Sequence, residues 1–183
     1  VAEWFETRGI STETLIDLQI SEGPEYMPQT GKTENTIKFN YYVGSQLINV
    51  KYRDGRKNFK LYKGAEKVFY NINSIVGYDS CVITEGEMDV LALHEAGIRN
   101  VISVPNGATI THNNLDYLDN CIDYFEDKKK IILALDTDAP GLALRTEFVR
   151  RLGAEACFLV DFEDCKDANE YLIKYGKEKL NKA

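Results

Sequence analysis

The two stretches that decide the fold are VITEGEMD (residues 82–89) and, further along the chain, IILALDTDAPG (residues 131–141). Each passes directly from an apolar run into a cluster of acids, as where a buried strand ends and a helix begins. In an open parallel α/β sheet, ligands bind at the edge that such strand ends form. Carboxylates gathered there without Lys or Arg partners repel one another, so the two stretches predict a cation site. Mg²⁺ is the expected ion because it takes carboxylate oxygens and leaves positions open for phosphate.

The rhythm around these stretches predicts the second part of the chain, residues 79–183. Strand-like and helical patterns alternate four times, with Gly97 and Gly153 ending helices. The expected strands are 81–84, 100–104, 130–135 and 155–160, and the expected helices are 87–96, 112–125, 140–152 and 167–174. Four β-α units in sequence indicate an α/β fold with a four-stranded parallel sheet and helices on both faces. The Lys-rich tail after Lys174 is expected to fray or to lead into another domain.

Residues 1–78 have a different pattern and are predicted to form a small α+β domain of their own. A short helix follows Ser11 or Thr12, either of which can cap it, and Gly23-Pro24 breaks the pattern after it. The polar residues 27–35 are typical of a loop. Three short strands rich in β-branched and aromatic residues follow, joined by turn residues, and predict an antiparallel sheet at 36–42, 46–52 and 58–62.

Charge divides the chain in the same place. The net charge is −7, but residues 1–78 carry ten Lys/Arg and nine Asp/Glu, whereas residues 79–183 carry twelve and twenty. The segment Lys51–Lys67 alone has seven basic and two acidic residues. This is the distribution expected if the first part holds a polyanion and the second part holds metal.

Composition argues against several classes of protein. The four cysteines form no Cys-x-x-Cys pair and there are only two histidines, so we expect no zinc in this chain, and we expect Cys81 and Cys157 to be core residues. No apolar stretch approaches the roughly 20 residues of a membrane span. The chain starts with Val-Ala-Glu-Trp, so no secretory signal is visible, and without a starting Met we expect a fragment of a longer protein. Four free thiols fit a reducing cytoplasm.

The acids of the first stretch differ in what they suggest. Glu85 is still at the strand end, so its side chain is expected to point into the crevice, and Gly86 allows the tight turn after it. Glu87 and Asp89 open the helix, where the helix dipole favours carboxylates, and simple capping would explain Glu87.

The later acids leave two interpretations open. Asp136 and Asp138 are separated by one residue and would project to the same side of an extended segment, where they could bind one or two cations. Capping of the next helix would explain Asp138 but not both residues. Asp167 either caps the last helix or faces the same crevice. Residues 104–108 (VPNGA) end the second strand and either form a plain turn or expose N–H groups near the crevice, and His112 is expected to cap a helix.

Taken together, these motifs resemble the TOPRIM domain, and more closely the primase core of bacteriophage primase–helicases and of the mitochondrial helicase Twinkle. The motifs that carry the resemblance are EGEMD (85–89), VPNGA (104–108), ALDTDAPG (134–141) and KDANE (166–170). In the first part, RGIS (8–11) and LINVKYR (47–53) resemble the basic subdomain that precedes TOPRIM in these primases. The resemblance covers nearly the whole chain, although there is no helicase motor motif and no Cys-rich zinc module.

The resemblance implies a DNA primase that uses Mg²⁺ or Mn²⁺, with two ions, to make short RNA primers on single-stranded DNA. The implied metal ligands are Glu85, Asp89, Asp136, Asp138 and Asp167, among which Glu85, Asp136 and Asp138 would be catalytic. Template or nucleotide phosphates would be held by Lys51, Arg53, Lys57 and Lys60. The implied partners are single-stranded DNA, nucleoside triphosphates and a replicative helicase or a helicase domain of the full-length chain, and the implied location is the cytoplasmic nucleoid.

Two other functions fit the same motifs. A TOPRIM nuclease would cut phosphodiesters with the same acids, although the basic first part favours a primase. A binding module would hold template or a partner helicase without catalysis. Tyr52, Phe59 and Tyr62 could stack on bases, but membership of the sheet core is the more ordinary expectation for them.

Overall fold

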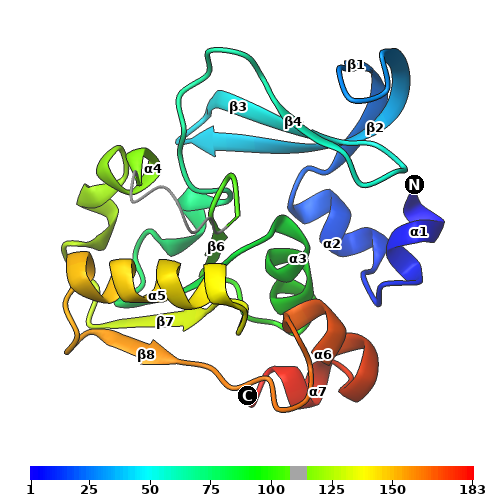
Figure 1. Ribbon diagram of the computed structural model, residues 1–183. Helices are drawn as coiled ribbons and strands as arrows, with labels where there is room; N and C mark the ends of the chain where they lie inside the picture. Colours follow the sequence, from blue (N-terminus) through cyan, green and yellow to red (C-terminus); the bar gives the residue numbers. More distant parts are fainter. Residues whose placement is uncertain (108–114) are drawn as a thin grey trace.

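The computed structural model describes residues 1–107 and 115–183, so the expectations for Ala108 and His112 lie outside the described residues. The chain forms two four-stranded sheets that lie one above the other in Figure 1. The first is antiparallel and the second is parallel with helices on its faces. The predicted α/β class, with a parallel sheet preceded by a smaller α+β part, is therefore confirmed.

The antiparallel sheet has one strand more than the sequence predicts. Its order is β1 (Ser21–Met27), β2 (Lys32–Val43), β3 (Gln46–Arg53) and β4 (Phe59–Leu61). The expected break at Gly23-Pro24 is wrong, because these residues lie within β1. Pro24 is tolerated there since β1 is an edge strand, where a missing N–H removes no bond to a further strand. Of the loop expected at 27–35, only the turn between Met27 and Lys32 exists, because Met27 ends β1 and residues 32–35 begin β2.

Two helices precede this sheet. α1 (Ala2–Glu6) was not predicted, and α2 (Thr12–Asp17) follows Ser11, whose hydroxyl accepts a hydrogen bond from the Thr14 N–H at 3.3 Å. After β4 the chain reaches the parallel sheet through the 3₁₀ turn η1 (Ile72–Ile75), and Tyr70 forms a β-bridge with Ser103. The first part of the chain is thus tied directly to the second.

The parallel sheet contains the edge that the acidic stretches predict. Its order is β6 (Val101–Ser103), β5 (Ser80–Thr84), β7 (Lys130–Ala134) and β8 (Cys157–Leu159). α3 (Glu87–Glu95) leads from β5 to β6, whereas α5 (Ala139–Leu152) leads from β7 to β8 in the opposite direction. The connections therefore diverge between β5 and β7, and a crevice forms outside the strand ends at such a switch point.

In the second part, the expected helix over 112–125 is wrong, and so is the first of the two alternatives for the tail. In place of one helix over 112–125, the described residues form the short α4 (Asp116–Asp119) and η2 (Ile122–Phe125), because Asp and Asn recur there and are poor helix formers. The tail does not fray: after α6 (Ala168–Tyr175), the helix α7 (Lys177–Leu180) buries Leu180. The Asn181 side chain also donates a hydrogen bond to the Ala96 carbonyl at 2.7 Å.

A single hydrophobic core joins both sheets. Phe39 and Tyr41 of β2 belong to the same buried cluster as Ile83 of β5 and as Tyr70, which lies between the two sheets in the sequence. Cys81 is buried as expected, whereas Cys157 is only half-buried. The proposed domain boundary at 78/79 stays a prediction. Among the residues described, no helix has both the length and the apolar character to cross a bilayer.

Candidate active site

Glu85 and Asp136 meet at the switch point between β5 and β7. The backbone N–H of Asp136 donates a hydrogen bond to Oε1 of Glu85 at 3.0 Å. Gly141, in the first turn of α5, lies directly against both: a Cβ atom built there would be 2.1 Å from the Asp136 carbonyl oxygen and 2.5 Å from Glu85 Oε1. The close approach of α5 to the two acids therefore requires glycine at this position.

Asp89 is buried beside them, in the first turn of α3. Its carboxylate accepts a hydrogen bond from the Asn169 N–H at 3.2 Å. Burial raises the pKa of Asp89 well above its ordinary value, and the charges of Asp167, Asp136 and Glu85 raise it further, against the opposing effect of the Asn169 N–H. Four of the predicted acids, Glu85, Asp89, Asp136 and Asp167, thus share one electrostatic environment, although they come from three separate stretches of the sequence.

A lysine that was not among the predicted site residues joins the acids. Nζ of Lys166 lies 2.9 Å from Oδ2 of Asp136, and it is more than half exposed. The pKa of Asp136 is nevertheless raised. Burial is the largest cause, and the charges of Asp167 and Asp138 add to it, whereas Lys166 acts in the opposite direction. The lysine therefore offsets only part of the repulsion within the cluster.

Asp138 and Asp167 each have a structural duty as well. Asp138 accepts a hydrogen bond from the Gly141 N–H at 3.0 Å and caps α5, and Asp167 accepts one from the Glu170 N–H at 2.8 Å and caps α6. Capping by Asp167 is confirmed. Its charge also raises the pKa of Asp89, but that Asp167 faces the crevice stays a prediction. Asp138 is exposed at the rim, so capping is its clearest role in this arrangement.

The donor set of the cluster fits a hard cation. Within residues 1–107 and 115–183, no three His, Cys, Asp or Glu side chains converge as a ready-made site for one ion. Mg²⁺ is usually held by one or two carboxylates with water and substrate phosphates, and does not need an all-protein cage. Glu85 and Asp136, joined through a backbone hydrogen bond and next to the buried Asp89, supply the oxygen ligands for that mode of binding.

A pH dependence follows from the raised pKa values. Between the ordinary value of 3.8 and the raised value of Asp89, the folded protein holds a proton that the unfolded chain has lost, so this group makes the protein less stable as pH rises. We expect the D89N variant to lose this contribution. Its free energy of unfolding relative to the wild type should therefore increase with pH, as measured by urea unfolding in EDTA from about pH 4.5 to about pH 7. D123N, at an exposed position, is the control, and a D89N difference that is flat with pH would contradict the prediction.

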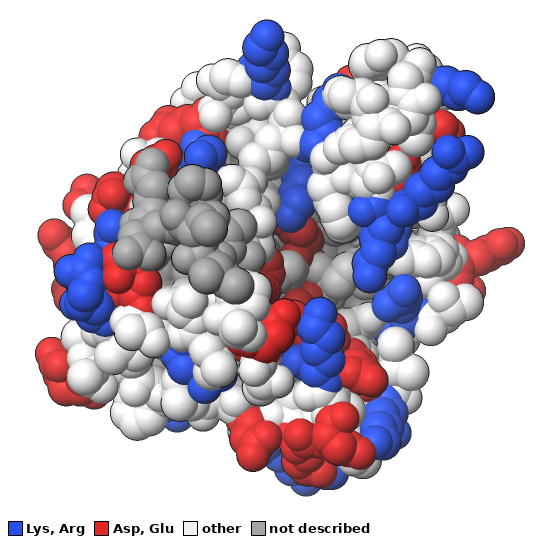
Figure 2. Space-filling view, viewed as in Figure 1, with Lys and Arg blue, Asp and Glu red and all other residues white. Residues whose placement is uncertain are grey.

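A cleft of about 430 Å³ lies beside the acids, between the two sheets. Figure 2 shows a hollow between the two halves of the molecule, with Lys and Arg atoms in its upper part and Asp and Glu atoms below them. Residues from β3, β4 and α1 form one wall, and the β5–α3 turn forms the other with Pro105, Asn106 and Gly107. The described part of the 104–108 segment therefore faces the crevice, as one of its two interpretations held.

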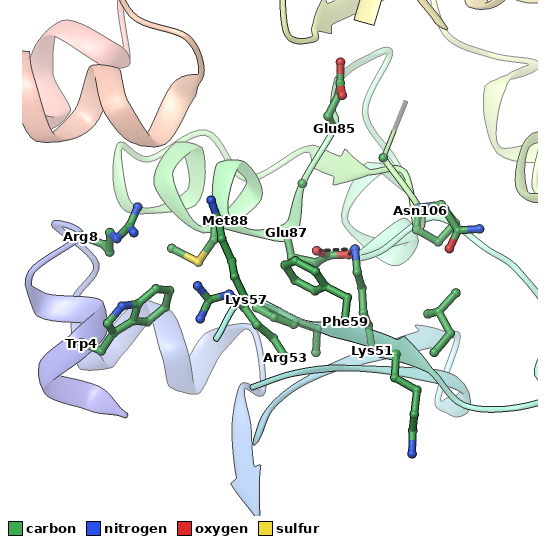
Figure 3. Close-up of a pocket in the computed structure, with 16 residues that line it drawn as sticks. Trp4, Arg8, Lys51, Arg53, Lys57, Phe59, Glu85, Glu87, Met88 and Asn106 are labelled. Carbon is green, nitrogen blue, oxygen red and sulfur yellow. Dashed lines mark hydrogen bonds and ion pairs between the residues drawn. The ribbon is translucent and has the colours of Figure 1, made fainter. Parts of the chain in front are cut away.

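Lys51 and Lys60 line this cleft but are held in ion pairs. Nζ of the buried Lys51 lies 2.9 Å and 3.0 Å from the two carboxylate oxygens of Glu87, as the dashed lines in Figure 3 mark. The hydroxyl of Tyr41 also donates to Glu87, so Glu87 does more than open α3. Nζ of Lys60 lies 2.6 Å from Oε1 of Glu25.

Arg53 and Lys57 line the same wall without carboxylate partners among the described residues. The turn after β3 is built on Asp54, which accepts hydrogen bonds at 2.9 Å from the N–H groups of Arg56 and Asn58. This turn places Lys57 in the left-handed region, at φ 70°. The cations that the sequence predicted for phosphate binding are therefore of two kinds, paired and unpaired.

The aromatic residues of this wall divide in the same way. Tyr52 is buried, as expected of a sheet core, but Phe59 and Tyr62 are 41% and 60% exposed, so that expectation is wrong for them. Phe59 lines the cleft. Sequence reasoning missed Trp4 and the site role of Arg8, although Arg8 belongs to a segment that resembles the basic subdomain of primases.

Comparison with known proteins agrees with this geometry. Residues 82–172 match the family model described as Toprim-like. This segment of the chain is therefore similar to TOPRIM domains, as its motifs predict.

Proteins named as primase homolog, Twinkle homolog, DNA primase and primase-helicase are among those similar to this chain. The chain is 35% identical to the primase homolog protein of Arabidopsis thaliana, over 100% of this chain and 58% of the relative. It is 33% identical to the Twinkle homolog protein, chloroplastic/mitochondrial, of the same plant, over 100% of this chain and 27% of the relative. The crystal structure of the primase fragment of the bacteriophage T7 primase-helicase protein superposes with a TM-score of 0.78 at 25% identity, over 96% of this chain and 69% of that one. The chain has the fold of a primase core and spans less than two thirds of the two plant relatives.

Proposed function

We propose that this chain is the catalytic core of a DNA primase, which synthesises short RNA primers on single-stranded DNA with Mg²⁺ or Mn²⁺. The observation that carries the proposal is the cleft itself, in which Glu85 at the sheet edge lies opposite a wall of basic side chains, with Asp136 and Asp89 next to Glu85. A phosphodiester-forming enzyme needs both: oxygen ligands for the metal and cations for the phosphates. The primase-core fold supports the same function.

The acids would hold the metal at the switch point. Glu85 and Asp136 are the principal ligands, Asp89 lies buried beside them, and Asp138 and Asp167 add negative charge at the rim. When bound, two Mg²⁺ ions would lower the pKa of the attacking 3′-hydroxyl and stabilise the leaving pyrophosphate. Glu85 is also the candidate general base for that hydroxyl, because the Asp136 N–H fixes its orientation at the strand end.

The basic wall would bind the nucleic acid and the nucleotide. Arg53 and Lys57 have their charges available for phosphates, whereas Lys51 and Lys60 contribute positive potential from fixed positions. We therefore propose single-stranded DNA and nucleoside triphosphates as partners. The location of the protein in the cytoplasm, at the nucleoid, stays a prediction. The names of the relatives support a helicase as a further partner, either as a separate protein or as another domain of a longer chain.

The test is synthesis of labelled oligoribonucleotides on single-stranded DNA with Mg²⁺ or Mn²⁺. We expect short products from the wild type and a loss of at least about 10²-fold in both E85Q and D136N, the order of effect of losing a transition-state-stabilising group. D123N, at an exposed position that does not line the cleft, is the matched control and should remain active.

Other outcomes would replace the proposal. Degradation of the template, lost in the same two variants, would identify a nuclease. DNA binding without any metal-dependent product, in this chain and in a longer chain that includes the remaining domains, would identify a binding module. The longer chain is needed because this one spans only part of its relatives.

A further inference from the structure

Trp4 lies at the end of the cleft away from the acids and is surrounded by cations. The guanidinium carbon of Arg53 lies 4.4 Å from the centre of its ring, and that of Arg8 lies 5.2 Å from it. Arg53 is also 5.9 Å from the ring centre of Phe59. In Figure 3, Trp4 and Arg8 lie on one side of the pocket and Glu85 on the other. The rings and guanidinium groups therefore form one cluster, distinct from the metal-binding end.

The two arginines have no acidic partner there. In the part of the chain that the structure describes, neither Arg8 nor Arg53 forms an ion pair or a side-chain hydrogen bond with a carboxylate. Arg53 is only 8% exposed, and a buried guanidinium normally pairs with an anion. Burial lowers the pKa of Arg53 and the charge of Arg8 lowers it further, against the smaller opposing effect of the Asp54 charge.

Aromatic rings can hold such charges in place without neutralising them. A ring face attracts a guanidinium through its quadrupole and leaves the N–H groups at the guanidinium edge free to donate. Two such forks beside each other match the oxygens of a phosphate. Trp4 thus fixes the position of the Arg53 guanidinium, as a carboxylate would, but leaves its positive charge available to a ligand.

We propose that Trp4, Arg8 and Arg53 form a phosphate-binding site at the end of the cleft, in which Trp4 is the positioning residue. The inference rests on the proposed function of the cleft and deepens it, because it names the ring that holds Arg53 in place and adds Arg8 to the groups that hold a phosphate of a nucleotide or of a polynucleotide backbone. Either source presents the same chemistry, and binding at this site requires neither metal nor turnover.

The test is binding in EDTA to two probes, a labelled oligothymidylate and free dTTP, at several salt concentrations. Wild type, W4A, W4F, R53Q and W4A/R53Q are compared, with R56Q and W4A/R56Q as matched controls, since Arg56 is an exposed arginine on the same turn that does not line the cleft. We expect W4A and R53Q to weaken binding by roughly 3- to 30-fold, equivalent to one cation–π or phosphate contact. On the oligonucleotide, each should lower the slope of log K against log salt by about 0.7. W4F should retain most of the affinity.

A double-mutant cycle separates positioning from general packing. If Trp4 acts through Arg53, W4A should have little further effect in the R53Q background but its full effect in the R56Q background. Trp4 is the only tryptophan in the chain, so its fluorescence reports the site directly, and a change on adding either probe should be lost in R53Q even if W4A does not fold.

The outcomes are distinct. Weakening for the oligonucleotide alone assigns the site to the template backbone, and weakening for dTTP alone assigns it to a triphosphate. Unchanged affinity and slope for both probes in W4A and R53Q would overturn the inference, as would an equal effect of W4A with and without Arg53. If the wild-type protein makes no primers but these binding effects are observed, the result counts against the primase proposal and leaves the phosphate site standing.

Discussion

Replacing Gly141 with alanine is expected to abolish metal-dependent primer synthesis without changing any charged residue. The new methyl carbon would lie 2.1 Å from the carbonyl oxygen of Asp136 and 2.5 Å from Oε1 of Glu85, far inside contact distance. Either α5 must move away or the 136–138 segment must shift, and both changes displace the acids from each other. Misplacement of a catalytic group by about 1 Å costs on the order of 10²-fold in rate, so we expect at least that loss.

The stability of G141A should fall as well, by about 1–3 kcal/mol, because the atom nearest to the added carbon is a backbone oxygen of Asp136, which cannot swing aside as a side chain can. G55A is the matched control, since nothing lies within 4 Å of a Cβ at that glycine. Primer synthesis and urea unfolding are measured on both variants. A G141A protein as active as G55A would show that α5 does not hold Glu85 and Asp136 in register.

The location of the acids could be predicted from the sequence because it depends on local patterns. A strand followed by a helix places the intervening residues at the edge of a parallel sheet wherever the strand lies in the order, so Glu85 and Asp136 were identified without knowing the topology. That the two acids lie next to each other follows from the strand order β6-β5-β7-β8, in which β5 and β7 are neighbours. No local sequence pattern contains this order. For the same reason, the sequence left open whether Asp167 faced the crevice.

The basic wall was harder to predict because charge alone does not identify a partner. Lys51 and Arg53 lie two residues apart on one strand, so the sequence treated them alike, yet one is paired with Glu87 and the other lies against Trp4. The Glu87 carboxylate comes from helix α3, far along the chain from Lys51. Helix α1, which carries Trp4, is too short to show a helical period in the sequence. Long-range pairing therefore separates a structural cation from one that is available to ligand.

Because Glu87 forms a buried ion pair with Lys51, we expect E87Q to lower the stability of the fold more than any other conservative change near the site. The two side chains are 11% and 5% exposed and connect β3 with the first turn of α3. Tyr41 adds a third member: burial and the Glu87 charge raise its pKa, so its hydroxyl stays protonated and donates. Removing the negative charge leaves Lys51 buried and unpaired, a change that costs about 3–5 kcal/mol.

The exposed pair of Lys60 and Glu25 is the control for E87Q. It has a similar distance, 2.6 Å, but its side chains are 25% and 28% exposed, so E25Q should cost less than about 1 kcal/mol in urea unfolding. K51M should be destabilising like E87Q, whereas the double variant K51M/E87Q should recover much of the loss, because neither partner is then left charged in the interior. Since α3 begins next to Glu85, E87Q should also reduce primer synthesis below that of E25Q. If E87Q and E25Q cost the same, the pair does not join the two sheets, and the basic wall is held to the acids by the hydrophobic core alone.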